Sequence, residues 1–324
     1  MTRIACIGAG RMGRGMAHAF AYAGYEVALI DAKQRDAAAF DALAAEAMAE
    51  MAGSLGLLAD LGALDRAQIS PILARISVHP RSAATEVLEG VRIVFEGVPE
   101  TRAAKAEALA FIDAHAGADT IVASTTSTFL STDLASMTVR PERFLNAHWL
   151  NPAYLVPLVE VSPHDFTRPD VTAELVALLK SIGKEPVVCK ASPGYIVPRI
   201  QMLAMNEAAR LVEEGVASAE DVDRAVKYGF GLRFAVLGLL EFIDWGGGDI
   251  LAYASRYMTE ATGQDRFKAP DVVEANMAAG RIGMKTGEGF YDWRGRDVDA
   301  VRREKLGAFL ALLRQMGALR PPVV

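Results

Sequence analysis

The sequence has little of what several classes of protein require. It contains two cysteines, Cys6 and Cys189, and five histidines, with no spacing typical of a zinc or redox motif. We therefore expect two packing cysteines in a reducing compartment and no metal site. Positive charge is not in excess either, since the net charge is −6, and this excludes the basic surface that a nucleic-acid partner needs.

Long apolar runs are also missing. The run from Phe234 to Leu240 is among the longest, far short of a membrane span, and no charged-then-apolar leader precedes the first predicted strand. We expect a cytoplasmic protein without a membrane partner. What remains is an ordinary globular composition, 52% hydrophobic and 23% charged, in a 324-residue chain long enough for two domains.

A glycine-rich turn follows directly on the first predicted strand. It consists of Gly8, Gly10, Arg11, Met12 and Gly13 with Ala9, in the pattern Gly-x-Gly-x-x-Gly, and a helix follows it. In a dinucleotide site the first glycine permits a tight turn, the second lets the backbone approach the pyrophosphate, and the third lets helix and strand pack closely. The N-terminus of the helix then offers amide donors to the phosphates. The pattern therefore predicts a cofactor-binding turn.

The second predicted strand ends in an acid, Asp31, about twenty residues after the glycine turn. A carboxylate at this place binds the ribose hydroxyls of the adenosine and repels a 2′-phosphate, so NAD is favoured over NADP. Lys33 and Arg35 follow closely and weaken that discrimination. A turn of the same shape that binds no nucleotide is the alternative, and the acid in its expected place argues against it.

A histidine and a glutamate stand at the facing ends of two apolar runs. His148 and Glu160 lie equally far from Tyr154, so two antiparallel strands around the turn at Asn151 and Pro152 would bring their side chains together. A carboxylate beside an imidazole fixes its tautomer and stabilises its protonated form. The spacing predicts an acid/base pair. The alternative is a half-buried histidine whose carboxylate neighbour is accidental.

Strands and helices alternate through the first half of the chain. We predict strands at 3–7, 26–31, 76–78, 91–98, 120–124 and 185–189, and helices at 15–23, 35–64, 65–74 and 101–115. Long helices without convincing strands follow, at 197–214, 219–228, 239–262 and 298–316. The fold class is therefore α/β, with a Rossmann-type, mostly parallel sheet covered by helices on both faces over residues 1–190. An all-α domain for substrate binding and dimerisation follows over residues 191–324.

Together these motifs resemble the NAD-dependent L-3-hydroxyacyl-CoA dehydrogenase family. That family includes 3-hydroxybutyryl-CoA dehydrogenases and relatives of the lambda-crystallin and carnitine dehydrogenase kind, which act on free hydroxy acids such as gulonate or carnitine. The resemblance runs from the glycine turn through 147–152 and 192–197 to 283–291. It implies an oxidoreductase of fatty acid metabolism, a homodimer, that passes a hydride from the 3-position of a 3-hydroxyacyl-CoA to NAD.

The resemblance also implies roles for single residues. The acid/base pair would supply the catalytic base and its partner carboxylate, and Ser127 would pair with the substrate oxygen beside the nicotinamide. Glu100 and Lys105 match an acid and a lysine that help to hold the cofactor, and Asn151 matches an asparagine near the nicotinamide and substrate. Taken alone, these residues are typical of turns, of a helix start and of a surface lysine.

Three departures from the family pattern leave the substrate open. Pro198 stands where the family has an asparagine that reaches the substrate, and proline cannot donate that hydrogen bond. Arg233 lies in the replaced segment 231–239, where a guanidinium suits recognition of a carboxylate. The stretch 50–65 lacks the basic cluster expected to meet CoA phosphates.

The substrate is therefore either a CoA thioester or a small free hydroxy acid. Arg233 has the alternatives of a salt bridge or a dimer contact. The alternative of another class is an NAD-binding structural protein without turnover.

Overall fold

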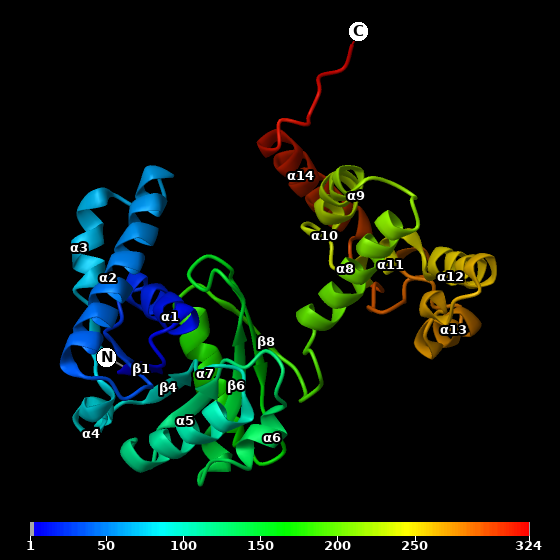
Figure 1. Cartoon of the computed structure of the whole chain (residues 1–324). Coiled ribbons are helices and arrows are strands. Elements are labelled where there is room, and N and C mark those ends of the chain that lie inside the picture. The colour runs from blue at the N-terminus through cyan, green and yellow to red at the C-terminus, as the bar shows by residue number, and fades with distance from the viewer. Residues whose placement is uncertain (1–2, 324) are drawn as a thin grey trace. The chain divides into compact units, whose positions relative to one another are not determined.

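The first part of the chain forms one eight-stranded sheet in the computed structural model, which describes residues 3–323 (Figure 1). The strands are β1 (Ile4–Ile7), β2 (Val27–Ile30), β3 (Ile76–His79), β4 (Ile93–Glu96), β5 (Ile121–Ser124), β6 (Phe144–Trp149), β7 (Leu158–Ser162) and β8 (Glu185–Val188). They lie in the order β3-β2-β1-β4-β5-β6-β7-β8, and only the pair β6 and β7 is antiparallel. The predicted mostly parallel Rossmann-type sheet is confirmed.

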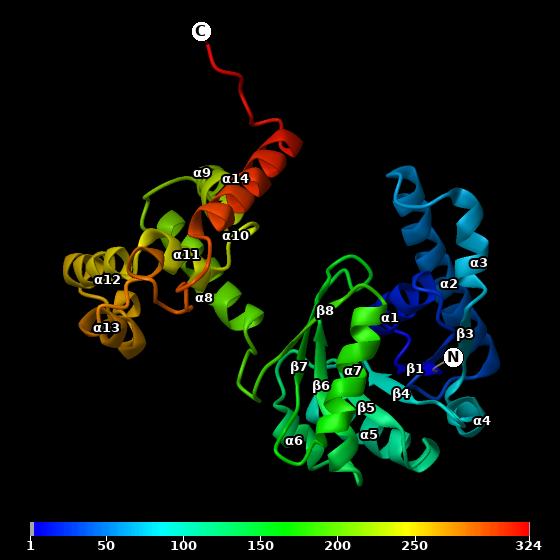
Figure 2. The ribbon, with the colours of Figure 1, turned by 180° about the vertical axis from the view of Figure 1, so that it is seen from behind.

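Helices cover both faces of this sheet (Figures 1 and 2). Those of the sheet region are α1 (Arg11–Tyr22), α2 (Ala37–Asp60), α3 (Ile69–Leu73), α4 (Ala84–Leu88), α5 (Arg102–His115), α6 (Ser131–Ala135) and α7 (Pro169–Ser181). Helices α1, α2, α3 and α7 pack on one face, and α4, α5 and α6 on the other.

The first strand shows why both faces need a cover. Ile4 and Cys6 point into the core under α1, whereas Ala5 and Ile7 point into the core under α5. Burial raises the pKa of the Cys6 thiol to about 12, which keeps it protonated as a packing residue. A strand buried on both faces therefore delivers the glycine turn from a rigid position.

Helix α2 is long and apolar, and by length and composition alone it is able to cross a membrane, with 24 residues and a mean hydropathy of 1.3 over its best window. In this fold Ala47, Met51 and Leu55 of α2 are buried in the core of the sheet region. Packing against the sheet region therefore explains the apolar residues on the buried face of α2.

The rest of the chain is helical. Its helices are α8 (Val197–Glu213), α9 (Ala219–Ala225), α10 (Leu232–Phe234), α11 (Leu239–Gly246), α12 (Gly248–Thr262), α13 (Asp271–Ala278) and α14 (Val298–Gln315), with a π-helical turn at Val226–Gly231. One helix predicted over 239–262 is in fact two, because Gly247 between α11 and α12 has φ +111°. An all-helical second region is as predicted.

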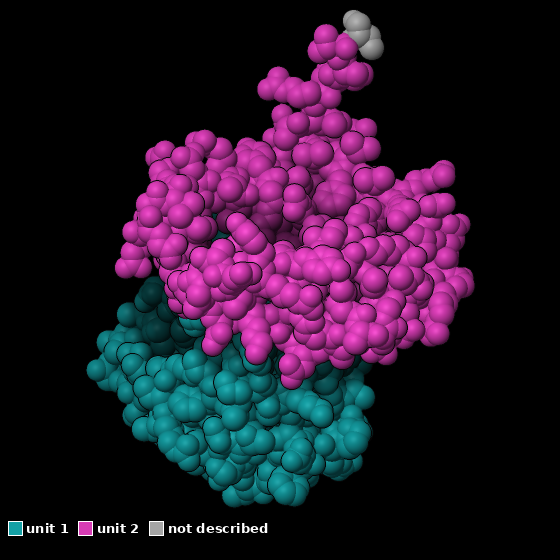
Figure 3. All heavy atoms as spheres, turned by 90° about the vertical axis from the view of Figure 1, so that its right-hand side faces the viewer, with its two compact units in different colours: residues 1–204 teal, residues 205–324 magenta. Residues whose placement is uncertain are grey.

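The chain divides into two compact units, residues 1–204 and 205–324, which Figure 3 colours separately. The division falls inside α8, between Ala204 and Met205. The boundary near Lys190 that the sequence suggests stays a prediction.

Candidate active site

The glycine turn has the close contacts that its pattern requires. Gly8 has φ +105°, and a Cβ there would meet the Gly97 carbonyl oxygen at 2.9 Å. A Cβ on Gly13 would meet the Gly8 carbonyl oxygen at 1.9 Å, so the turn and α1 lie too close for any side chain. At Gly10 a Cβ would meet nothing within 4 Å, which leaves open space beside the backbone where a pyrophosphate has to approach.

The N-terminus of α1 is available to an anion. Gly10 is its N-cap, so no side chain caps it, and its first turn contains no acidic residue. The free amides and the helix dipole therefore favour a phosphate at this end. The described residues fit a dinucleotide here.

Asp31, directly after β2, is buried and already engaged. Its carboxylate accepts a hydrogen bond from the Lys33 amide at 3.0 Å and forms an ion pair with Arg35, whose Nε lies 2.6 Å away. From the sequence, Arg35 is expected only to be a positive charge near Asp31. In the structure Arg35 is the direct ion-pair partner of Asp31, the acid predicted to select the cofactor.

His148 and Glu160 face each other across β6 and β7, in register. The His148 Nδ1 atom lies 2.8 Å from Glu160 Oε2, which confirms the predicted meeting of the two side chains. With Nδ1–H donating to the carboxylate, the lone pair of the ring is on Nε2, which makes no hydrogen bond with residues 3–323. This is the arrangement of a general base with its orienting carboxylate.

Glu160 is kept ionised by its surroundings. Its side chain is fully buried, and burial raises the pKa of the carboxyl. The hydrogen bonds from His148 and from the Val197 and Ile196 amides act in the other direction, and the net result is a pKa below the ordinary value. Those amides, at the start of α8, donate to Oε1 at 2.8 and 2.9 Å. Each oxygen of the carboxylate thus has its own partner.

Ser127 lies on an exposed turn after β5, and its hydroxyl makes no hydrogen bond within the described part of the chain. Glu100 holds this turn: its Oε1 accepts hydrogen bonds from the Thr126 hydroxyl and from the amides of Ser127 and Thr128, the last two at 3.0 Å. Burial raises the pKa of Glu100, but these bonds and the charge of Lys105 outweigh it, so the pKa is lowered. The described hydrogen bonds and the ion pair of Glu100 are all with other residues of the chain.

Lys105 is likewise an internal residue. Its side chain is 1% exposed, and Nζ lies 3.0 Å and 3.1 Å from the two Glu96 carboxylate oxygens and 3.4 Å from Glu100. The surface lysine suggested by the bare sequence is therefore wrong. The described contacts place Glu96, Glu100 and Lys105 under the turn that carries Ser127.

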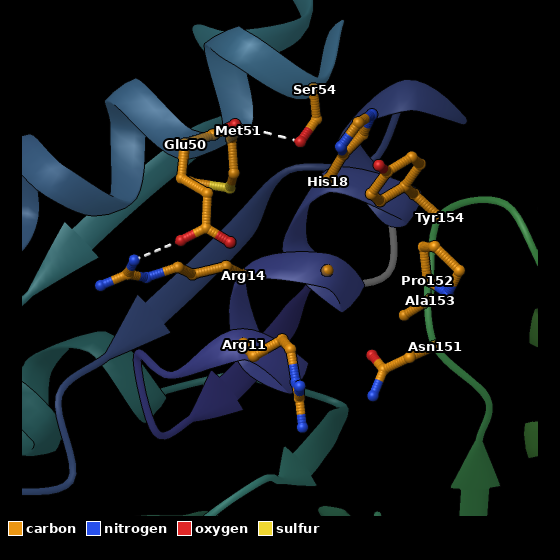
Figure 4. Close-up of a pocket in the computed structure, with 11 residues that line it drawn as sticks. Arg11, Arg14, His18, Glu50, Met51, Ser54, Asn151, Pro152, Ala153 and Tyr154 are labelled. Atoms are coloured by element: carbon orange, nitrogen blue, oxygen red, sulfur yellow. Dashed lines mark hydrogen bonds and ion pairs between the residues drawn. The ribbon is translucent and has the colours of Figure 1, made fainter. Parts of the chain in front are cut away.

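Asn151 lines a cavity of about 210 Å³ that the turn after β6 forms with α1 and α2 (Figure 4). Its lining residues are Arg11, Arg14, Gly15, His18, Glu50, Met51, Ser54, Asn151, Pro152, Ala153 and Tyr154. Arg14 forms ion pairs with Glu46, at 3.0 Å, and with Glu50. The His18 ring stacks on Tyr154, with centroids 4.3 Å apart. Burial, followed by the charge of Lys184, lowers the pKa of His18 to about 4, so this ring is neutral near neutral pH.

Two residues singled out as departures lie in or near α8 and α10. Pro198 stands in the first turn of α8, where a missing N–H costs nothing. Arg233 of α10 is exposed, its guanidinium lies over the Phe242 ring at 5.6 Å, and no ion pair joins it to a carboxylate among residues 3–323. The salt-bridge alternative for Arg233 therefore has no partner within the described chain.

The region 283–291, part of the resemblance, has a structural explanation. Asp244 of α11 is 2% exposed and accepts hydrogen bonds from the amides of Phe290 and Tyr291 and from the Trp293 indole. A Cβ on Gly289 would lie 2.2 Å from Asp244 Oδ1. The glycines of this segment let it close over a buried carboxylate. Among the described residues no cluster of metal ligands is present.

Asn146 was not predicted as a site residue, and Tyr195 was expected only as an aromatic residue of a pocket wall or of the core. Asn146 is fully buried two residues before His148, and therefore on the same face of β6, a placement that the two-residue period of a strand reveals. Tyr195 packs on His148, and nothing in its sequence position predicts that contact.

Comparison with known proteins gives a consistent result. Residues 3–192 match the family described as 3-hydroxyacyl-CoA dehydrogenase, NAD binding domain, and residues 194–293 match its C-terminal domain. A 5-formyl-3-hydroxy-2-methylpyridine 4-carboxylate 5-dehydrogenase of Mesorhizobium japonicum is 34% identical, over 97% of this chain and 98% of its own. The mitochondrial hydroxyacyl-coenzyme A dehydrogenase of Sus scrofa is 33% identical, over 91% and 92%.

A solved structure resembles the whole chain as well. The 3-hydroxyacyl-CoA dehydrogenase of Archaeoglobus fulgidus superposes with a TM-score of 0.76 at 31% identity, covering 98% of this chain and 100% of its own.

Proposed function

The chain belongs to the 3-hydroxyacyl-CoA dehydrogenase family, an NAD-dependent group that acts on CH–OH, and from this premise we propose that His148 is its catalytic base. The observation that carries the proposal is the His148 Nδ1 contact with Glu160 at 2.8 Å, which leaves Nε2 free. Bound NAD supplies the hydride acceptor.

The residues of this chain have distinct tasks in the proposed reaction. Nε2 of His148 takes the hydroxyl proton of the substrate, and the buried carboxylate of Glu160 stabilises the imidazolium that results. Ser127, with its unengaged hydroxyl on a turn held by Glu100, donates to the substrate oxygen. Asn151 and Arg11 line the neighbouring cavity and hold the cofactor and substrate there.

We propose, for the substrate itself, a small hydroxy or aldehyde compound with a free carboxylate rather than a CoA thioester. Arg233 has an exposed guanidinium without a carboxylate partner in the described chain. Helix α2 carries acidic residues and no Lys or Arg, and Glu46 and Glu50 already engage Arg14. Such a surface disfavours the phosphates of CoA. The Mesorhizobium relative, named for a pyridine carboxylate, supports this choice.

The second candidate is a 3-hydroxyacyl-CoA of the 3-hydroxybutyryl-CoA type, which the names of other relatives favour. A screen that follows NADH separates the two. It pairs 3-hydroxybutyrate with 3-hydroxybutyryl-CoA, includes gulonate, carnitine and a formylpyridine carboxylate, and compares wild type with Arg233→Ala.

We expect Arg233→Ala to lower kcat/KM for the free acid by two or more orders of magnitude, because a desolvated carboxylate loses a charged partner, at a cost of roughly 2–4 kcal/mol. Turnover of the thioester changes little. Arg302→Ala serves as the matched control, since it removes an exposed guanidinium 3.7 Å from Asp299. Activity on the thioester alone, untouched by Arg233→Ala, contradicts the free-acid proposal.

A further inference from the structure

Tyr195 has an unusual backbone. Its φ is +46°, and it is the only non-glycine residue with positive φ among residues 3–323. A left-handed conformation costs a residue with a Cβ roughly 1 kcal/mol or more, so it persists where surrounding contacts hold it. The contacts of Tyr195 therefore identify what the strain maintains.

The ring of Tyr195 lies flat against the proposed base. Its centroid is 5.0 Å from that of the His148 imidazole, and the two planes are within 1° of parallel. The side chain is 6% exposed, so water does not compete for this face of the imidazole. Together with the Nδ1 contact to Glu160, the stack restricts rotation of the imidazole about its side-chain bonds.

The hydroxyl of Tyr195 reaches a second part of the site. It donates to the Thr126 carbonyl oxygen at 2.9 Å and accepts from Asn146 Nδ2 at 3.0 Å. Thr126 directly precedes Ser127. Burial raises the pKa of the phenol, so the group stays protonated and remains a donor to that carbonyl.

The residues after Tyr195 bind the third member of the site. The amides of Ile196 and Val197 donate to Glu160 Oε1, so the same short segment contacts the imidazole, its carboxylate and the serine turn. Tyr195 is the residue whose side chain touches both the His148 ring and the Thr126 carbonyl in the described contacts.

We propose that Tyr195 is a positioning residue that holds His148 and Ser127 in a fixed relation to each other. This inference rests on the proposed function, in which both residues meet one substrate oxygen. The phenol hydroxyl is the specific device, because a phenylalanine would keep the stack and lose the link to Thr126. His148 Nε2 has to meet the proton, and the Ser127 hydroxyl the oxygen, of one C–OH group. A small misplacement of either group lowers the reaction rate rather than the binding affinity.

The test is a double-mutant cycle of Tyr195→Phe with Ser127→Ala, on the best substrate of wild type. Tyr195→Phe is expected to lower kcat about tenfold, with the NADH dissociation constant changed by less than about twofold. In the Ser127→Ala background the same substitution is expected to cause almost no further loss, because the hydroxyl acts through that serine. Losses that multiply would show that the hydroxyl does not act through Ser127, and would overturn the inference.

Tyr25→Phe is the matched control, since its hydroxyl has one partner, Ser181 at 2.8 Å, away from the site. Its kcat is expected to equal that of wild type. If the Tyr195 hydroxyl had only a structural role, Tyr195→Phe would lower the melting temperature, and its effect on kcat would be additive with that of Ser127→Ala.

A second measurement needs no turnover. The imidazole proton resonances of His148 are expected to show a ring-current shift in wild type and Tyr195→Phe, and to lose it in Tyr195→Leu. An unchanged shift in Tyr195→Leu would overturn the stack. A wild type inactive on every alcohol and aldehyde contradicts the proposed function, whereas an active wild type with a fully active Tyr195→Phe contradicts only this inference.

Discussion

Charged side chains in the sheet region act in pairs, and the partner decides what each one can do. Glu160 is buried but bound on both oxygens, which keeps it ionised beside His148. Arg14 is buried as well, and the carboxylates of Glu46 and Glu50 balance its positive charge beside the cavity. A residue type alone therefore does not fix its role.

Asp31 and its partner Arg35 are expected to decide the cofactor preference. The ion pair of Asp31 with Arg35 places a guanidinium next to the carboxylate that is predicted to face the ribose. Wild type is expected to bind NADH more tightly than NADPH, because the 2′-phosphate meets the carboxylate. Asp31→Ala frees Arg35 for that phosphate, and we expect the preference to move toward NADPH by about tenfold or more.

Fluorescence titration of both cofactors checks this expectation. Arg66→Ala is the control, since its exposed guanidinium pairs with Asp60 at the end of α2. Equal binding of the two cofactors by wild type is the outcome that would reject this role of Asp31.

The spacing of His148 and Glu160 about Tyr154 was enough to predict their contact, because an antiparallel pair fixes its register from the turn. The contact of Tyr195 with His148 was not predictable in this way. Tyr195 lies 47 positions further along, in a left-handed turn whose direction the local sequence does not determine. Long-range packing, rather than local pattern, decides such a neighbour.

Glycines and caps determine where helices end and what their ends contact. Gly8 and Gly13 permit the approach of β1 to α1, a prediction that the contacts support. The run Gly246-Gly247-Gly248 indicates an irregularity in the helix predicted over 239–262, and the structure has the break between α11 and α12 at Gly247. The apolar pattern of this stretch shows which side of the helix faces inward, but by itself it does not show where the helix breaks.

The buried carboxylate of Asp244 in α11 is expected to stabilise the fold. Asp244→Ala leaves three donors, two half-buried amides and the buried Trp293 indole, without their acceptor. We expect the free energy of unfolding to fall by about 3 kcal/mol, measured by urea denaturation followed by circular dichroism.

Asp292→Ala is the matched control, because that carboxylate is exposed and pairs only with Arg294 in the described contacts. Its midpoint is expected to stay near that of wild type. An Asp244→Ala midpoint indistinguishable from the control would show that Asp244 does not hold segment 283–291.

Helices α8 and α14 leave much apolar surface of the molecule uncovered. Helix α8 and helix α14 contain no buried residue, and Met202 and Leu203 are 62% and 68% exposed. Exposed apolar faces of this extent are typical of an interface. We propose a two-fold dimer through this surface.

Light scattering at micromolar concentration is expected to give twice the chain mass of 34.7 kDa. Leu203→Glu is expected to shift the mass toward the monomer, because a charge placed in an apolar interface is costly to bury. Glu213→Gln, near the end of α8, is a control that adds no charge to that face. A monomeric wild type contradicts the dimer.

The alternation of strands and helices established the sheet from sequence, since parallel strands buried on both faces read as apolar runs. The division between the two compact units has no comparable signal in the sequence. Helix α8 runs through the division at residue 204, so no change of composition marks it.

Turnover of His148→Gln, measured as NADH formation on the best substrate beside Glu160→Gln, tests most directly whether His148 is the catalytic base. Glutamine keeps a hydrogen bond to Glu160 within reach but cannot take a proton, so kcat is expected to fall by at least about a hundredfold while NADH affinity is unchanged. Glu160→Gln is expected to lose less, since the imidazole remains. If His148→Gln retains more than roughly a tenth of the wild-type kcat, His148 is not the base and the proposed mechanism is wrong.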